Sequence, residues 1–412
     1  MDFNMSVGNV IVGQSGGPTS VINSSLAGVF QTARDRGAGT IYGMKNGIQG
    51  FLEDRYIDMS QHIKTDLHIE LLKRTPSAYL GSCRFKLPEI EENEAVYSKI
   101  FQKLNNLEIK YFFYIGGNDS MDTIKKLSEY GAREGSDIRF MGVPKTIDND
   151  LAETDHTPGY GSAAKFIATS MKEIIKDANV YGNQNIHVVE IMGRNAGWLA
   201  ASAALAKRED CIGPDLIYLP EIAFDTDKFL KKVGELRKEK KSIVVAVSEG
   251  LKLKDGTYVC EQISSQAKFT DSFGHMTLGG TAQYLANLIT EEYGCKSRAI
   301  DLSILQRCSS HIVSRVDITE AFVAGGHAVE AAFRGETAKM IIFNRVTNNP
   351  YQCTTEPYDI NKIANIEKKV PLEWIINDGT YVSPEFISYA NPLIQAELSP
   401  IMVGGLPSHM YN

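Results

Sequence analysis

Residues 143–150, VPKTIDND, place a cation, a hydroxyl and two carboxylates close together along the chain. Phosphoryl transfer to a hydroxyl needs a carboxylate that takes the acceptor's proton, and it needs positive charge near the transferred group. Asp148 suits the first task and Lys145 the second. A turn with solvated charges is the alternative, but the apolar stretch IRFMGV leads directly into these residues. The pattern therefore favours phosphoryl-transfer chemistry at the end of a buried strand.

Two glycine-rich stretches could bind the anionic groups of such a reaction. GQSGGPTS contains Gly16 and Gly17, and GGNDS contains Gly117, Asn118 and Asp119. Glycines let a phosphate approach the backbone, and the N–H groups at a helix start attract anions. Each stretch is also typical of a tight turn, and an acid at a helix start complements the helix dipole. GQSGGPTS lacks the GxxxxGK[ST] pattern, so it is not a Walker P-loop.

Three further stretches, VVEIMGRNAG, VSEG and SRAIDLSILQR, carry residues that suit a sugar phosphate. These residues are Met192, Gly193, Arg194, Glu249, Arg298 and Arg307. A guanidinium group can bind phosphate through two parallel hydrogen bonds, and a carboxylate can accept hydrogen bonds from sugar hydroxyls. The alternative for each arginine is an ion pair on the surface.

The elements that must position these residues alternate between strand and helix. The apolar runs at residues 7–13, 110–117, 138–144 and 186–192 are predicted strands, and residues 161–178 have apolar side chains at helical spacing. Such alternation indicates an α/β fold with parallel sheets covered on both faces. Ligands of open α/β sheets bind at the carboxyl ends of the strands. Because the residues above follow predicted strands, we expect them to form one composite site.

Composition excludes several classes of function. The chain has 412 residues and a formal net charge of −7, which gives no general reason to expect a nucleic-acid partner. No apolar run approaches the ~20 residues that span a bilayer, and the first residues lack the pattern of a signal peptide. The six cysteines are scattered without a CxxC pair, which is typical of reduced thiols. We therefore expect a cytoplasmic protein that binds no membrane.

In this order and at these spacings, the motifs resemble those of the phosphofructokinase family, most clearly at PKTIDND and MGR. The resemblance extends from about Val10 to Arg307. It implies two Rossmann-like domains with mostly parallel sheets and an active-site cleft between them. The implied reaction is a glycolytic phosphoryl transfer to the 1-hydroxyl of fructose 6-phosphate with Mg²⁺, in a homo-oligomer (dimer or tetramer).

The resemblance also implies domain boundaries in the chain and a role for each site residue. Residues 1–182 would bind the phosphoryl donor, residues 183–350 would bind fructose 6-phosphate, and residues 351–412 would form a C-terminal wrapping segment. The implied catalytic residues are Asp148, Lys145, Asp119 and Thr146. The implied pyrophosphate ligands are Gly16, Gly17, Gly117, Arg84 and Lys145. The implied fructose 6-phosphate ligands are Thr146, Asp148, Asp150, Met192, Gly193, Arg194, Glu249, Arg298 and Arg307. Asn118 is the implied metal ligand.

The pair of Asp119 and Lys145 resembles the pyrophosphate-dependent branch of the family, because ATP-using members typically carry glycine at both positions. A carboxylate at 119 would repel the inner phosphate of ATP, and the ammonium of Lys145 would stabilise charge as pyrophosphate breaks. The implied products are fructose 1,6-bisphosphate and orthophosphate, in a reversible reaction. The alternatives are an ATP-dependent 6-phosphofructokinase and a catalytically weak sugar-phosphate-sensing subunit.

Three positions depart from the family pattern. Asn118 stands where many relatives have a metal-binding aspartate, so a magnesium ion would gain a neutral ligand there. Asn185 stands where bacterial ATP-using members carry an arginine that reaches a neighbouring subunit's substrate. Ile304 replaces a histidine or tyrosine near the sugar phosphate.

Overall fold

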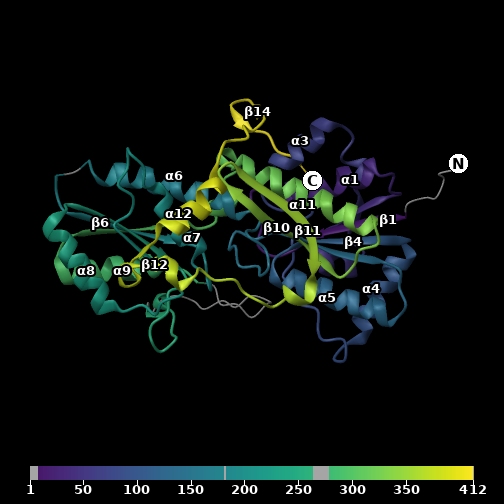
Figure 1. The fold of residues 1–412 in the computed structure, drawn as a ribbon, viewed down its shortest axis with the longest axis horizontal. Helices are drawn as coiled ribbons and strands as arrows, with labels where there is room; N and C mark the ends of the chain where they lie inside the picture. Colours follow the sequence, from purple (N-terminus) through teal and green to yellow (C-terminus); the bar gives the residue numbers. More distant parts are fainter. Residues whose placement is uncertain (1–7, 181, 263–277, 412) are drawn as a thin grey trace.

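The computed structural model describes residues 8–180, 182–262 and 278–411. Two helix-covered sheets lie next to each other along the longest axis of the molecule (Figure 1). The first sheet has seven strands and the second has four. The predicted α/β architecture with mostly parallel sheets is confirmed. We call the parts built on these sheets the first and the second domain.

The first sheet is parallel except at its two edges. Its strands, in spatial order, are β11 (Tyr351–Asp359), β10 (Lys339–Asn348), β5 (Arg139–Pro144), β4 (Ile109–Gly116), β1 (Asn9–Gln14), β2 (Ile41–Met44) and β3 (Tyr56–Asp58). Only β11 and β3 run antiparallel to their neighbours. Parallel neighbours need crossover connections, which the helices between them provide.

Helices cover both faces of this sheet. They are α1 (Ile22–Asp35), α3 (Asp66–Arg74) and α11 (Arg315–Phe333) on one face, and α2 (Gly47–Leu52), α4 (Glu94–Asn106) and α5 (Asn118–Arg133) on the other. The side chains of β1 alternate between the two cores: Val10 and Val12 pack with α1 and α11, whereas Ile11 packs with α4 and α5. A strand that is buried on both faces has a continuous run of apolar residues, as Val10, Ile11 and Val12 show.

The second sheet is entirely parallel. Its strands are β7 (Leu216–Tyr218), β8 (Ser242–Ser248), β6 (Asn185–Ile191) and β9 (Lys296–Asp301). One face is covered by α6 (Tyr160–Ala178) and α7 (Trp198–Ala201), and the other by α8 (Thr226–Glu239) and α9 (Thr281–Tyr293). Every residue of β6 is buried, as expected for a central parallel strand.

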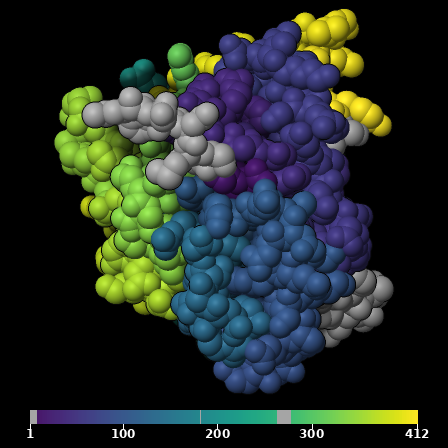
Figure 2. Space-filling model, turned by 90° about the vertical axis from the view of Figure 1, so that its right-hand side faces the viewer, coloured from purple at the N-terminus to yellow at the C-terminus, as the bar shows by residue number. Residues whose placement is uncertain are grey.

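The two sheets divide the chain differently from the expected boundaries at residues 182 and 350. Helix α6 precedes the first boundary but packs on the second sheet. Helix α11 and strand β10 precede the second boundary but belong to the first domain. Figure 2 shows the later residues, in light green, directly beside the N-terminal residues in purple and blue. Helices α6 and α11 and strand β10 are ordinary helices and strands and not flexible linkers. Composition alone therefore does not reveal where the chain changes domain.

The residues after β11 run from the first domain to the second and then return to the first (Figure 1, yellow), where the N–H of Met410 donates to Thr75 Oγ1 at 2.8 Å. They contain β12 (Ile375–Ile376), β13 (Tyr381–Val382), α12 (Pro384–Ala390), β14 (Met402–Val403) and β15 (Leu406–Pro407). Phe386 of α12 is fully buried against Trp198 and Trp374. Among the described residues, no helix has the length and apolar character that crossing a membrane requires.

Candidate active site

A cleft of about 560 Å³ lies where loops of the two domains meet. Its walls come from the residues that follow β1, β4, β5, β6 and β8, together with the short helix α10 (Leu305–Cys308). The predicted site residues in these walls are Gly16, Gly17, Arg84, Gly117, Asn118, Asp119, Lys145, Thr146, Asp148, Asp150, Met192, Arg194, Glu249 and Arg307. The structure therefore brings together loops that are far apart in the sequence at the carboxyl ends of parallel strands.

Gly193 shapes the cleft through its backbone. Its φ is +128°, and a Cβ here would lie 2.7 Å from the carbonyl oxygen of Ala196. Its N–H donates to Glu249 Oε1 at 3.2 Å, and its carbonyl accepts from Ser248 Oγ at 2.6 Å. The turn that carries Arg194 is thus tied to the end of β8 and tolerates only glycine at this position.

Arg298 is not brought to this cleft. It lies on β9 opposite His187 of β6 and lines a separate surface hollow with Lys296 and Asp177. Asn185 lines the same region and donates to the Ala178 carbonyl at 3.1 Å. Within one copy of the chain, Arg298 is therefore apart from the other predicted ligands of the sugar phosphate.

Lys145 closes one side of the glycine-rich turn after β1. Its Nζ donates to the carbonyl of Gly17 at 2.7 Å, and a Cβ on Gly16, whose φ is +75°, would lie 3.2 Å from that nitrogen. Burial lowers the pKa of Lys145 to about 8, against the opposing effect of Asp148 and Asp150. The side chain is thus mainly cationic at neutral pH, and its charge lies against backbone that a phosphate can approach.

Three guanidinium groups add to this positive charge. Nη1 of Arg307 lies 3.2 Å from the position that a Cβ on Gly17 would occupy. Burial lowers the pKa of Arg84, and the charges of Arg307 and Arg194 lower it further. Cations that are close enough to perturb one another in a partly buried cleft favour an anionic ligand. The cleft therefore suits phosphate groups, although the whole chain is acidic.

The cleft also contains carboxylates with raised pKa values. Thr146 Oγ1 donates to Asp148 Oδ2 at 3.3 Å and accepts from the Asp148 N–H at 3.1 Å. Burial raises the pKa of Asp148, although the charge of Lys145 opposes this. Burial and the charge of Asp148 raise the pKa values of Asp150 and Glu249 to about 7. A carboxylate with a raised pKa is a stronger base, which suits proton abstraction from a hydroxyl.

Buried hydrogen bonds fix the loop that carries Asp148. Asn149 is fully buried and has a φ of 55°, a left-handed conformation that asparagine tolerates better than most residues. Its Oδ1 accepts from the N–H of Thr157 at 3.0 Å, and its Nδ2 donates to Tyr389 Oη at 2.8 Å. Thr157 Oγ1 donates to the carbonyl of Thr146 at 2.8 Å. The loop is therefore rigid beneath the cleft.

The donor set of the cleft fits a magnesium ion. Asn118 begins α5, and its Oδ1 is buried without accepting a hydrogen bond from the described residues. A buried acceptor that lacks a partner costs about 1–3 kcal/mol, so a ligand at this oxygen would be favourable. Carboxylate and amide oxygens are the ligands that Mg²⁺ prefers, and Asp119, Asp148 and Asp150 also line the cleft.

Comparison with known proteins identifies the family of this chain. The family profile described as Phosphofructokinase matches residues 9–332. The chain belongs to the phosphofructokinase family. The predicted family is thereby confirmed. The predicted fold of two Rossmann-like domains is confirmed by its similarity to a solved structure from Nitrosospira multiformis.

The matches to two relatives extend over nearly the whole chain. The chain is 40% identical over 411 residues to a protein of Methylococcus capsulatus and 39% identical over 407 residues to one of Halomonas elongata. Both are named pyrophosphate–fructose 6-phosphate 1-phosphotransferase, and both matches cover 98% of this chain and 96% of the relative. A crystal structure of pyrophosphate-dependent phosphofructokinase from Nitrosospira multiformis superposes with a TM-score of 0.87 at 37% identity, covering 97% of this chain and 95% of that one.

Sequence reasoning missed some residues of the phosphofructokinase cleft. The additional residues in its walls are Pro18, Ser120, Ile147, Asn195, Ala196, Asn365 and Glu367. Most of them adjoin a motif and could have been found from it. Asn365 and Glu367 lie beyond the residues that match the family profile, and no local pattern marks them.

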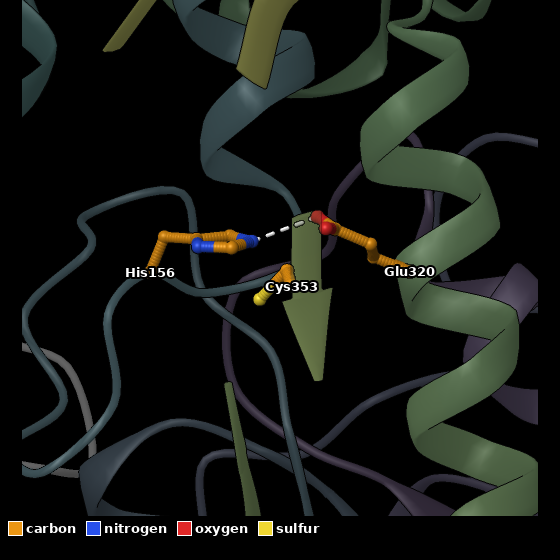
Figure 3. A group of neighbouring side chains, drawn as sticks. All are labelled: His156, Glu320 and Cys353. Carbon is orange, nitrogen blue, oxygen red and sulfur yellow. Dashed lines mark hydrogen bonds and ion pairs between the residues drawn. The ribbon is translucent and has the colours of Figure 1, made fainter. Parts of the chain in front are cut away.

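A network of buried charges, which the sequence did not indicate, lies behind the Asp148 loop. Both nitrogens of His156 contact carboxylates. Nε2 is 2.7 Å from Glu320 Oε2 (Figure 3), and Nδ1 is 2.8 Å from Asp155 Oδ1. Arg345 donates to Asp155 at 2.8 Å, and Tyr351 Oη donates to Glu320 Oε1 at 2.7 Å. The network connects the loop after β5 to α11 and to the edge of the first sheet.

Each carboxylate of this network is paired with a cationic side chain. Cys353 lies beside His156 and Glu320 in Figure 3, and such a trio can bind metal in other proteins. Here Nε2 of His156 is already in contact with the Glu320 carboxylate. Burial alone would lower the pKa of His156, but Glu320 and Asp155 raise it to about 9. The imidazolium therefore balances the carboxylates around it.

We expect His156 to stabilise the fold at neutral pH and to lose this effect in alkaline solution. Its pKa is about 9 in the folded chain against an ordinary value of 6.5. The contribution is therefore full below about pH 6.5 and disappears as the pH rises through about 9. The melting temperature of the wild type should exceed that of His156→Gln by a margin that shrinks over this range. A margin independent of pH would contradict the ion-pair assignment.

Proposed function

We propose that this chain transfers a phosphoryl group from pyrophosphate to the 1-hydroxyl of fructose 6-phosphate, as a reversible cytoplasmic step of glycolysis. The products are fructose 1,6-bisphosphate and orthophosphate. The observation that carries the proposal is the presence of Asp119 and Lys145 in one phosphofructokinase cleft, beside the glycine-rich turn after β1. The names of the full-length relatives support the same reaction.

Asp148 is the proposed proton acceptor. The 1-hydroxyl of the sugar attacks the nearer phosphorus of pyrophosphate, its proton passes to the Asp148 carboxylate, and the P–O bond to the leaving orthophosphate breaks. Thr146 orients the carboxylate through the two hydrogen bonds described above. Lys145 and Arg84 stabilise the negative charge that moves onto the leaving phosphate.

Asp119 is the proposed donor selector. It lies in the first turn of α5 and lines the cleft, and its carboxylate opposes the lowering of the Arg84 pKa that burial and the neighbouring arginines cause. A nucleotide donor would have to place its inner phosphate and nucleoside beyond the two reacting phosphates. A fixed negative charge there disfavours ATP and leaves pyrophosphate unaffected.

The second domain supplies the proposed fructose 6-phosphate site. Arg194 and Arg307 would bind the 6-phosphate, and Glu249 would accept hydrogen bonds from sugar hydroxyls. Met192 and Gly193 would shape the wall against which the sugar lies. Asp150 also lines the cleft and would add a further polar contact to the sugar.

Arg298 leads to a proposal about assembly. Because it faces a hollow outside the cleft, its proposed contact with the sugar phosphate would be made in the cleft of a neighbouring copy. The proposal is therefore a homo-oligomer, a dimer or a tetramer, in which this face lies at the interface between two copies.

Magnesium is the proposed cofactor. Asn118 would hold it through the unpaired Oδ1, together with carboxylate oxygens of the cleft. When bound, the ion neutralises charge on the phosphates of the donor.

A panel of phosphoryl donors tests the proposed function. The purified chain is incubated with fructose 6-phosphate and Mg²⁺ in the presence of pyrophosphate, ATP or neither, and fructose 1,6-bisphosphate is measured. Turnover with pyrophosphate alone is expected, together with pyrophosphate formation from fructose 1,6-bisphosphate and orthophosphate. Turnover with ATP alone would favour the ATP-dependent enzyme, and no turnover with either donor would favour the sensing subunit.

Arg194→Ala is expected to weaken the binding of fructose 6-phosphate. A hydrogen bond to a charged group contributes about 1.5–3 kcal/mol, which corresponds to a rise in KM of roughly 10- to 150-fold. The KM for pyrophosphate should change little, because the donor occupies the other domain. An unchanged sugar-phosphate KM at saturating pyrophosphate would show that Arg194 has only a structural role.

A further inference from the structure

Residues 365–370, which we call the strap, connect the two walls of the cleft. The strap follows the last β-strand of the first domain and precedes β12 in the second. It lies beyond residue 332, where the match to the family profile ends. Two of its side chains, Asn365 and Glu367, line the cleft.

The strap is held firmly to the first domain. Asn365 Nδ2 donates to Asp122 Oδ1 at 2.9 Å, and Asp122 itself forms a buried ion pair with Lys126 at 2.8 Å. The N–H of Lys368 donates to the carbonyl of Asp150 at 2.8 Å, and Glu367 pairs with Leu151 as an isolated β-bridge. The backbone of the strap is therefore in register with the end of the Asp148 loop.

The strap is also bonded to the second domain. Trp198 Nε1 donates to the carbonyl of Lys368 at 3.0 Å, and the N–H of Val370 donates to Glu221 Oε1 at 3.0 Å. Immediately before these anchors, Glu367 Oε1 accepts from Asn195 Nδ2 at 2.7 Å. The backbone of Glu367 thus belongs to the first domain, whereas its side chain contacts the second.

The Glu367–Asn195 bond acts on the turn that contains Arg194. Gly193, Arg194 and Asn195 are consecutive, and on one side Gly193 is bonded to Ser248 and Glu249. On the other side, Asn195 Nδ2 donates its hydrogen bond to the Glu367 carboxylate. A turn with a glycine at a positive φ relies on such flanking contacts to keep one conformation.

We propose that Glu367 is a positioning residue for fructose 6-phosphate, which rests on the proposed role of Arg194 as a ligand of the sugar phosphate. By accepting the Asn195 hydrogen bond, Glu367 holds the Arg194 turn toward the cleft. Because its backbone is fixed beside Asp150, it also sets the distance between the sugar-binding turn and the Asp148 loop. The role needs an acceptor oxygen at this position and does not need its negative charge.

Two substitutions at Glu367 separate the hydrogen bond from the charge. Glu367→Gln keeps an acceptor oxygen for Asn195, and Glu367→Ala removes it. We expect Glu367→Ala to raise the KM for fructose 6-phosphate about threefold to tenfold, the ratio that corresponds to one net hydrogen bond. Glu367→Gln should stay near the wild-type value, and the KM for pyrophosphate should be unchanged in both variants. Glu373→Ala, an exposed carboxylate after the strap, is the matched control.

A double-mutant cycle with Asn195→Ala tests whether the effect passes through the bond. The two alanine substitutions should be non-additive, because either one removes the same contact. If Glu367→Gln were as impaired as Glu367→Ala, or if the cycle were additive, the proposal would be wrong.

Measuring Arg194→Ala in the same assay separates the test of the proposed sugar-phosphate site from the test of the positioning role of Glu367. An unaffected Arg194→Ala would overturn the proposed sugar-phosphate site, whereas an impaired Arg194→Ala beside an unaffected Glu367→Ala would overturn only the positioning role.

Discussion

Asp148→Asn is expected to lower kcat with pyrophosphate by about 10²- to 10⁴-fold, the usual effect of losing a general base. The amide keeps the size of the side chain, and its oxygen can still accept a hydrogen bond from the Thr146 hydroxyl, which lies 3.3 Å from Asp148 Oδ2. It cannot take the proton of the sugar hydroxyl. Steady-state kinetics at saturating substrates measure the loss, and calorimetric titration with fructose 6-phosphate should show that binding is largely kept.

The melting temperature of Asp148→Asn is the first control, because removing a buried carboxylate with a raised pKa should not destabilise the fold. Asp66→Asn, on an almost fully exposed side chain of α3, is the second. Near wild-type turnover in a folded Asp148→Asn variant would remove this residue from the role of base.

Lys145→Met should cause the second large loss. The thioether side chain fills most of the same buried space but removes the ammonium that donates to Gly17. A preorganised group that stabilises transition-state charge is worth about 2.7–4 kcal/mol, or roughly 10²- to 10³-fold in kcat. The loss should appear in kcat with pyrophosphate more than in the KM for fructose 6-phosphate.

Lys73→Met, at a partly exposed lysine on α3, controls for the substitution itself. If Lys145→Met raised only the KM for pyrophosphate and left kcat intact, Lys145 would bind the donor equally in the ground state and the transition state. Its proposed role in the transfer step would then be wrong.

The loops of the cleft could be predicted because each follows a strand that is recognisable by itself. Apolar runs mark β4 and β5, and parallel strands end at the same edge of a sheet, so the neighbourhood of Asp119 and Lys145 follows from general rules. The partners of these residues inside the loops were not predictable. The left-handed Asn149 and its bond to Tyr389 join residues that are remote in the sequence.

The positions of Arg298 and Glu367 and the true domain boundaries depend on contacts between segments that are remote in the sequence, so they could not be predicted from it. Arg298 occurs in the same stretch as Arg307, yet β9 ends between them and the two side chains face different hollows. Glu367 has no glycine-rich turn or strand end beside it, and its place depends on the β-bridge to Leu151. The domain boundaries were displaced for the same reason, since α11 returns to pack on α1 of the first domain.

The claim that Asp119 makes the cleft select pyrophosphate is central to this account, and Asp119→Gly tests it most directly. The measurement is kcat/KM for pyrophosphate and for ATP in the wild type and in the variant, with fructose 6-phosphate saturating. The account predicts no measurable ATP-driven turnover in the wild type and clear ATP-driven turnover in Asp119→Gly, because the space and charge that oppose the inner phosphate are removed. An Asp119→Gly variant that still rejects ATP and keeps wild-type kinetics with pyrophosphate would contradict it, and Asp119 would then serve only the start of α5.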